Sequence, residues 1–177
     1  FDGIQGMYHE EDQPDPVNHY GYSKWQAEKL VQAYPHPWSV VRTVLVYGKP
    51  VLGRPNFLSI VAERLRSGAT YSVVDDQFRT PTFAGDLAAG VAKLIKDKHR
   101  GIFHLCGEEI MTPYDMALRT AAHLDLDPSG IRRVSESTFQ QPARRPKKTG
   151  LNIQKAKQVI GFQPRSFEEG LALSFSK

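Results

Sequence analysis

The sequence predicts an α/β fold with a mostly parallel sheet, because strand-like and helix-like segments alternate along its 177 residues. Two segments carry most of this prediction. Residues 38–47, WSVVRTVLVY, are rich in β-branched side chains and almost continuously apolar, which is typical of a parallel strand buried on both faces. Residues 86–97, DLAAGVAKLIKD, have the apolar spacing of a helix, and a second apolar strand is expected after them at 101–105.

The other expected elements continue the alternation. A first helix is expected between Asp15-Pro16 and Tyr34-Pro35, with four apolar side chains available for one face: Trp25, Leu30, Val31 and Tyr34. Further helices are expected at 57–66, 153–160 and 167–175, and a short strand at 70–74. Thr112-Pro113 predicts the start of another helix, because threonine caps a helix and proline is tolerated in its first turn.

Composition excludes several classes of protein. Apolar residues make up 40% of the chain and charged residues 24%, which argues against a disordered protein. Cys106 is the single cysteine, which excludes a disulfide framework, and no apolar run approaches the ~20 residues that cross a bilayer. The histidines lack the spacing of metal ligands. We therefore expect a cytoplasmic protein with no membrane span and no metal.

The charge distribution gives little support to a nucleic-acid partner. The net charge is only +4, and most basic residues are dispersed. The densest basic group is Arg144-Arg145-Pro146-Lys147-Lys148. Two interpretations stay open for this group: a solvated surface loop, or a pocket for an anion such as the phosphate of a small molecule.

Tyr20 and Lys24 are the residues whose spacing points to chemistry, because they share one face of the first expected helix. A phenol with its ordinary pKa near 10 donates a proton poorly at neutral pH, and lowering that pKa towards 7 takes roughly 4 kcal/mol of phenolate stabilisation. A neighbouring ammonium group supplies a field of the right sign. The following strand ends at Gly48, at the edge where open α/β sheets bind ligands. The spacing alone also fits an ordinary pair on an exposed helix surface.

The residues around this pair resemble the Tyr-x-x-x-Lys helix of the extended short-chain dehydrogenase/reductases, and more narrowly the dTDP-4-dehydrorhamnose reductase family. Residues 18–24, NHYGYSK, followed by Glu28, carry this resemblance. Further segments are similar to the family in order and spacing: Phe1-Asp2-Gly3, Arg42 to Gly48, Asp76 to Thr82 with Asp86-Leu87-Ala88, Gly101 to Gly107, and Arg145-Pro146 with Leu151. The resemblance covers essentially the whole chain.

The resemblance implies the carboxyl-side part of a doubly wound, Rossmann-like parallel-sheet reductase, with a small α/β substrate-binding region. Residues 1–48 and 84–106 would form part of the nucleotide-binding sheet, and residues 49–83 and 107–177 the substrate-binding part of one truncated unit. No glycine-rich G-x-G-x-x-G loop occurs in the sequence. We therefore expect the chain by itself to be inactive, and to form a homodimer or to associate with a missing amino-terminal half.

The same resemblance implies roles for the catalytic and cofactor-binding residues. Tyr20 would donate a proton to the substrate carbonyl, and Lys24 would lower the pKa of Tyr20 and bind the nicotinamide ribose. Thr43 and Val44, at the end of the strand, would help to seat the cofactor, either NADPH or NADH.

Three residues are candidates for substrate binding. Arg79 stands where the family has a glycine, and it would face the diphosphate of a nucleotide-linked sugar; a salt bridge at the rim is the alternative. Arg145 is a second candidate for the diphosphate. Gln77 could contact the substrate through its amide or support a buried turn.

The implied function is the NAD(P)H-dependent reduction of a nucleotide-linked 4-keto-6-deoxy sugar by the full-length oxidoreductase, as in dTDP-L-rhamnose biosynthesis. Two alternatives stay open. One is another nucleotide-sugar epimerase or dehydratase. The other is a non-catalytic regulatory subunit similar to the methionine adenosyltransferase β subunit, which Phe1-Asp2-Gly3 and Glu10-Glu11-Asp12 also resemble.

Overall fold

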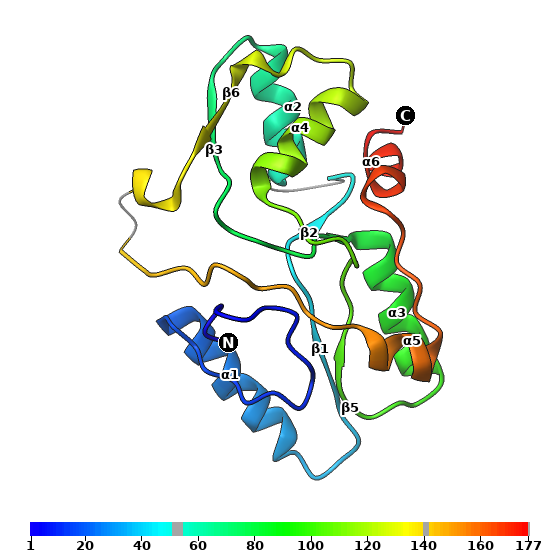
Figure 1. The fold of residues 1–177 in the computed structure, drawn as a ribbon. Coiled ribbons are helices and arrows are strands. Elements are labelled where there is room, and N and C mark those ends of the chain that lie inside the picture. The colour runs from blue at the N-terminus through cyan, green and yellow to red at the C-terminus, as the bar shows by residue number, and fades with distance from the viewer. Residues whose placement is uncertain (51–54, 140–141, 177) are drawn as a thin grey trace.

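A computed structural model describes residues 1–50, 55–139 and 142–176, and its α/β fold with parallel strands confirms the predicted fold class (Figure 1). Three parallel pairs of strands make up its sheets: β1 (Ser39–Arg42) with β5 (Gly101–His104), β2 (Val46–Tyr47) with β4 (Thr82–Phe83), and β3 (Tyr71–Val74) with β6 (Ile131–Val134). The helices are α1 (His19–Gln32), α2 (Phe57–Arg66), α3 (Ala84–Lys96), α4 (Pro113–His123), α5 (Gln154–Ile160) and α6 (Phe167–Phe175), with short 3₁₀ turns at Pro128–Gly130 and Glu136–Thr138.

The helices pack around two regions of the fold. Helices α3 and α5 cover one face of the β1–β5 pair, where their Leu94 and Ile160 side chains join Phe103 of β5 in a buried cluster. Helices α2 and α4 cover the β3–β6 pair through a second cluster that contains Val61 and Ala117. A third cluster, between β2, α2, α4 and α6, connects the two regions: Tyr47, Leu58, Met111, Met116, Phe167 and Leu171. Figure 1 shows α1 away from α3 and α5, on the other side of β1.

Local sequence signals account for the helix boundaries. Thr112 caps α4 in a capping box with Asp115, and Pro113 occupies its first turn, as predicted. Asn18 caps α1, so that this helix begins at His19, four residues after Asp15, rather than directly after Asp15-Pro16. The predicted helices at 57–66 and 167–175 are confirmed at the same bounds.

The single strand predicted at 38–47 is wrong. The chain forms β1 and β2 instead, and these pair with different partners, β5 and β4. Leu45, between them, has a left-handed backbone with φ of 41°, which interrupts the extended conformation. The carbonyls of Val44 and Leu45 both accept hydrogen bonds from Thr82, from its hydroxyl and its backbone N–H respectively, which holds this bend.

Two predictions about burial are also wrong. In β1, Ser39 is exposed and the other three residues are only partly buried, whereas the partner strand β5 buries Phe103 and His104. Helix α1 buries none of its residues, and Leu30 is 75% exposed. Of the four apolar side chains expected on one face of the first helix, Trp25 is partly buried, and Leu30, Val31 and Tyr34 are exposed in the described chain. The strands β4 and β6 were missed, because β4 has two residues and the middle of β6 is Arg132-Arg133, both exposed.

Candidate active site

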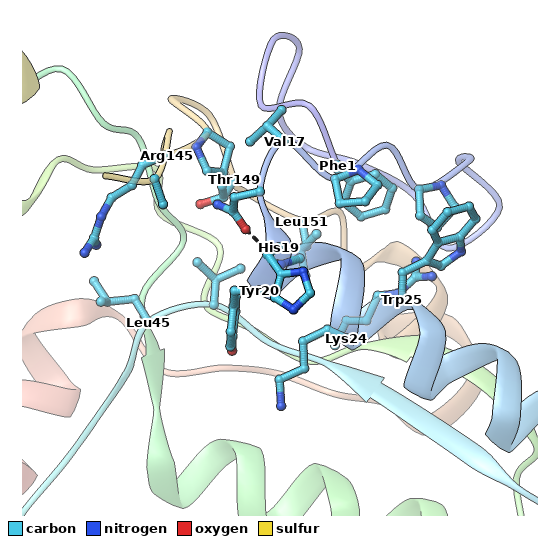
Figure 2. Close-up of a pocket in the computed structure, with 18 of the residues that line it drawn as sticks. Phe1, Val17, His19, Tyr20, Lys24, Trp25, Leu45, Arg145, Thr149 and Leu151 are labelled. Atoms are coloured by element: carbon cyan, nitrogen blue, oxygen red, sulfur yellow. Dashed lines mark hydrogen bonds between the residues drawn. The ribbon is translucent and has the colours of Figure 1, made fainter. Parts of the chain in front are cut away.

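A cavity of about 860 Å³ opens where the start of α1, the end of β1 and the segment from 142 to 151 meet (Figure 2). Its lining contains six of the seven residues that the sequence singled out: Tyr20, Lys24, Thr43, Val44, Arg79 and Arg145. These residues come from four separate segments, and the fold brings them to one place. The seventh, Gln77, is absent from this lining and contacts the Arg79 side chain.

Tyr20 and Lys24 lie at the start of α1 and extend into the same open region of the cavity (Figure 2). The Oδ1 atom of Asn18 accepts a hydrogen bond of 2.8 Å from the backbone N–H of Gly21, which sets the first turn and places Tyr20 in it. One turn later, the Lys24 Nζ lies 5.5 Å from the centroid of the Tyr20 ring. The Tyr20 side chain is 71% exposed, so a ligand in the cavity can reach its hydroxyl.

Thr43 and Val44 follow the last residue of β1 and form the floor of the cavity beside Tyr20. The Thr43 hydroxyl donates to the hydroxyl of Thr82 at 3.1 Å, and the Thr82 hydroxyl donates to the carbonyl of Val44 at 2.6 Å. These bonds fix the carboxyl end of β1, which is the position where parallel sheets bind ligands.

Arg79 presents a guanidinium group that is held by neutral oxygen atoms. Its Nη1 donates to the Thr149 hydroxyl at 2.9 Å and to the carbonyl of Pro146 at 3.1 Å, and its Nη2 donates to the Gln77 Oε1 at 2.7 Å. Burial, and secondly the charge of Arg145, lowers the pKa of Arg79 below its ordinary value. Because none of these acceptors carries a charge, they do not match the interpretation of Arg79 as one half of a rim salt bridge. Arg79 also lines the cavity, and its role in binding an anion stays a prediction.

The structure gives Gln77 a supporting contact. Its side chain is 5% exposed, and its Oε1 accepts from Arg79. This contact fits the interpretation of Gln77 as buried support for the turn. Direct contact of Gln77 with a substrate stays a prediction.

The residues of the basic group at 144–148 differ in where they lie. Arg145 lines the cavity, on the side opposite Lys24 in Figure 2. Lys147 is exposed, with Asp76 3.8 Å away. The carbonyl of Arg144 accepts a hydrogen bond of 2.8 Å from the Asn18 side chain, which ties this segment to the start of α1.

Several lining residues of the cavity were not singled out as site residues from the sequence, among them Leu45, Thr149, Glu28 and Arg42. Leu45 was hidden inside an apolar run that predicts a continuous strand, and no local signal reveals its left-handed backbone. Thr149 has no motif around it, and only the tertiary structure places its hydroxyl against Arg79. Among the described residues, no group of three or more histidine, cysteine, aspartate or glutamate side chains has a geometry that could hold a metal ion.

The family model of the RmlD substrate binding domain matches residues 1–177. The chain belongs to this family. A dTDP-4-dehydrorhamnose reductase from Bacillus anthracis, solved in complex with NADP, superposes on this RmlD-family chain with a TM-score of 0.90 at 29% identity, over 99% of this chain and 61% of that one. This superposition confirms the Rossmann-like reductase fold and the resemblance on which it was predicted.

Curated relatives of this RmlD-family chain have two kinds of name. A dTDP-4-keto-6-deoxy-D-glucose reductase from Streptomyces niveus is 32% identical over 153 residues, which are 85% of this chain and 52% of the relative. A methionine adenosyltransferase 2 subunit beta from Danio rerio is 29% identical over 172 residues, which are 94% of this chain and 53% of the relative. The chain thus spans about half the length of these relatives. Among the described residues, no helix combines the length and the apolar character needed to cross a bilayer.

Proposed function

We propose that the full-length protein reduces the 4-keto group of a dTDP-linked 6-deoxy sugar, with NADPH or NADH as the hydride donor. One observation carries this proposal: Tyr20 and Lys24 share a cavity with two arginines, Arg79 and Arg145, that come from other segments. A proton donor beside a pair of cations suits a substrate that has a carbonyl at one end and a diphosphate at the other.

The lining residues fit a nicotinamide nucleotide. The Lys24 ammonium and the Tyr20 phenol are groups that hydrogen-bond the hydroxyls of a ribose, and both extend into the open cavity. Val44 and Leu45 offer an apolar surface beside them at the end of β1. A reduced nicotinamide supplies the hydride when it is bound.

The chain's own residues would perform the remaining chemistry. As the substrate carbonyl oxygen gains negative charge, the O–H bond of Tyr20 breaks and its proton moves to that oxygen, which becomes a hydroxyl. The Lys24 ammonium, one turn away, stabilises the phenolate that is left on Tyr20. Arg79 would hold the substrate diphosphate, and Gln77 and Thr149 would keep the Arg79 guanidinium in place.

A second candidate function is a non-catalytic regulatory subunit, because relatives named as subunit beta of methionine adenosyltransferase 2 match 94% of the chain. Such a subunit could keep the Tyr20–Lys24 pair, so these two residues do not separate the candidates.

The deciding experiment incubates the full-length protein with NADPH and a dTDP-4-keto-6-deoxy sugar, and follows NADPH absorbance and the mass of the sugar. We expect stoichiometric oxidation of NADPH with reduction of the sugar. Conversion of the sugar with no net loss of NADPH would favour an epimerase or dehydratase. No conversion, together with binding to a methionine adenosyltransferase catalytic chain, would favour the regulatory subunit.

A further inference from the structure

Helix α1 carries Tyr20 and Lys24, but apolar packing does not hold it in place. None of its residues is buried, and Leu30 on its carboxyl-terminal half is 75% exposed. A helix without a buried face gains little from the hydrophobic contacts that normally determine the position of a helix on a sheet. Within the described part of the chain, polar contacts therefore contribute much of what holds α1 in position.

The strongest polar contact between α1 and the sheet joins Glu28 to Arg42 of β1. Arg42 Nε donates to Glu28 Oε1 at 2.9 Å, and Arg42 Nη2 donates to Glu28 Oε2 at 2.7 Å. The Arg42 side chain is 12% exposed and the Glu28 side chain 18%, so this bidentate ion pair is mostly shielded from water. Glu28 lies four residues after Lys24 and eight after Tyr20, which puts it on the same side of the helix.

Arg42 is anchored in turn on the buried part of the fold. Its Nη1 lies 3.3 Å from Nε2 of His104, a fully buried residue of β5. The Nδ1 of His104 lies 3.1 Å from the carbonyl oxygen of Asn152, which can only accept, so Nδ1 carries the hydrogen and Nε2 accepts from Arg42. The backbone N–H of His104 donates to the buried Glu10 at 2.9 Å.

We propose that Glu28 and Arg42 are positioning residues, which hold α1 against β1 so that Tyr20 and Lys24 stand at the correct distance from the reacting groups. The proposal rests on the function proposed above. Both residues also line the cavity, but their charged groups bind each other, and the role proposed for them is to position the helix rather than to react. Since Tyr20 and Lys24 lie on the same helix, loss of the ion pair displaces them together and leaves their mutual geometry intact.

This geometry predicts a specific kinetic pattern for the full-length protein. In Glu28→Ala, kcat is expected to fall about 10–100-fold, because small displacements of reacting groups are costly. The KM for the sugar is expected to change less than about threefold, because Arg79 is held by Gln77 and Thr149, which lie outside α1. Because partial unfolding would also lower the apparent kcat with an unchanged KM, kcat is calculated per mole of folded enzyme, with the folded fraction measured by circular dichroism.

The matched control is Glu109→Ala, which removes an ion pair of the same length, 2.7 Å to Arg119, at a distance from α1. It is expected to keep the wild-type kcat. Glu28→Gln keeps an acceptor for one Arg42 donor and is expected to lie between wild type and Glu28→Ala. If Glu28→Ala does not fold, Arg42→Lys serves instead. This variant keeps the positive charge but cannot bind the Glu28 carboxylate through two parallel hydrogen bonds, and it is expected to lower kcat about fivefold or more.

The same assay includes Tyr20→Phe, so that the two hypotheses can fail separately. If Tyr20→Phe is inactive while Glu28→Ala or Arg42→Lys keeps kcat within twofold of wild type, the positioning role is overturned and the proposed function stands. If Tyr20→Phe keeps normal turnover, Tyr20 is not the acid and the positioning role is overturned, while the reductase function stands. If the wild type does not reduce the sugar, the proposed function itself is overturned.

Discussion

The buried Gln77 side chain accepts a hydrogen bond of 2.7 Å from Arg79, two residues further along the chain. With Thr149 on the other side, it holds the guanidinium at the cavity wall without neutralising it. If Arg79 binds the substrate diphosphate as proposed, its side chain has already lost much of its conformational freedom, which lowers the entropic cost of binding.

Arg79→Ala is expected to weaken binding of dTDP to the full-length protein by about 1.5–3 kcal/mol, because it removes a charged hydrogen-bonding group. Cofactor binding is expected to stay unchanged. Titration calorimetry measures the affinity for dTDP and for the cofactor. Arg133→Ala is the control, since Arg133 is an exposed arginine of β6 that forms an ion pair with Asp75. Equal affinity of the Arg79 variant and the wild type for dTDP would leave Arg79 with a structural role only.

Tyr20→Phe is expected to lower reductase turnover of the full-length protein by about 10²–10⁴-fold, because it removes the proton donor and little else. Affinity for the cofactor is expected to stay within a few fold. Tyr22→Phe is the matched control, since Tyr22 lies on the same helix and is also exposed, at 48%. Near-normal turnover of Tyr20→Phe in stopped-flow or steady-state assays would exclude Tyr20 as the acid.

The 177-residue chain by itself is expected to self-associate and to bind NADH weakly. In the part of the chain that the structure describes, β1 pairs only with β5, so the other edge of β1 is open to another strand. No glycine-rich loop is available for the pyrophosphate. Light scattering and NADH fluorescence test the two points, and Val40→Lys, which charges the open strand, is expected to reduce association. A stable monomer with micromolar affinity for NADH would contradict both expectations.

Stability is expected to depend on pH through His104. Burial is the main cause that lowers the pKa of His104, with a smaller effect of Arg42, while Glu10 opposes them. The unfolded chain, with a pKa near 6.5, therefore binds a proton at a higher pH than the folded one. The contribution of neutral His104 to the free energy of unfolding is fully present above about pH 7. It is lost as the pH falls below 6.5, by up to about 1.4 kcal/mol per pH unit.

Chemical denaturation of the full-length protein between pH 5.5 and 7.5 measures this dependence of the free energy of unfolding. His104→Gln is the control, because a glutamine amide can donate to Asn152 and accept from Arg42 without titrating. We expect a flatter pH dependence in this variant. An equal slope in the variant and the wild type would assign the pH dependence to other groups.

The sequence by itself determined the fold class and most of the helices. Alternating apolar patterns and local caps are short-range signals, and those of α2, α4 and α6 can be read within a few residues, such as Thr112 with Asp115. It also determined the candidate catalytic pair, because side chains that are four residues apart lie on the same face of a helix. Family motifs then supplied Thr43, Val44, Arg79 and Arg145, all of which line the cavity.

Only the tertiary structure decided how these residues meet and what supports them. The bend at Leu45 depends on hydrogen bonds from Thr82. The position of the Arg79 guanidinium depends on its hydrogen bond to Thr149, 70 residues away. The exposure of α1 could not be predicted either, since apolar spacing shows which face can be buried but not whether a partner covers it. Its link to the core runs through Glu28, Arg42 and His104, three residues on three elements. Contacts of this kind depend on the packing of distant segments, and no pattern within one segment of the chain encodes them.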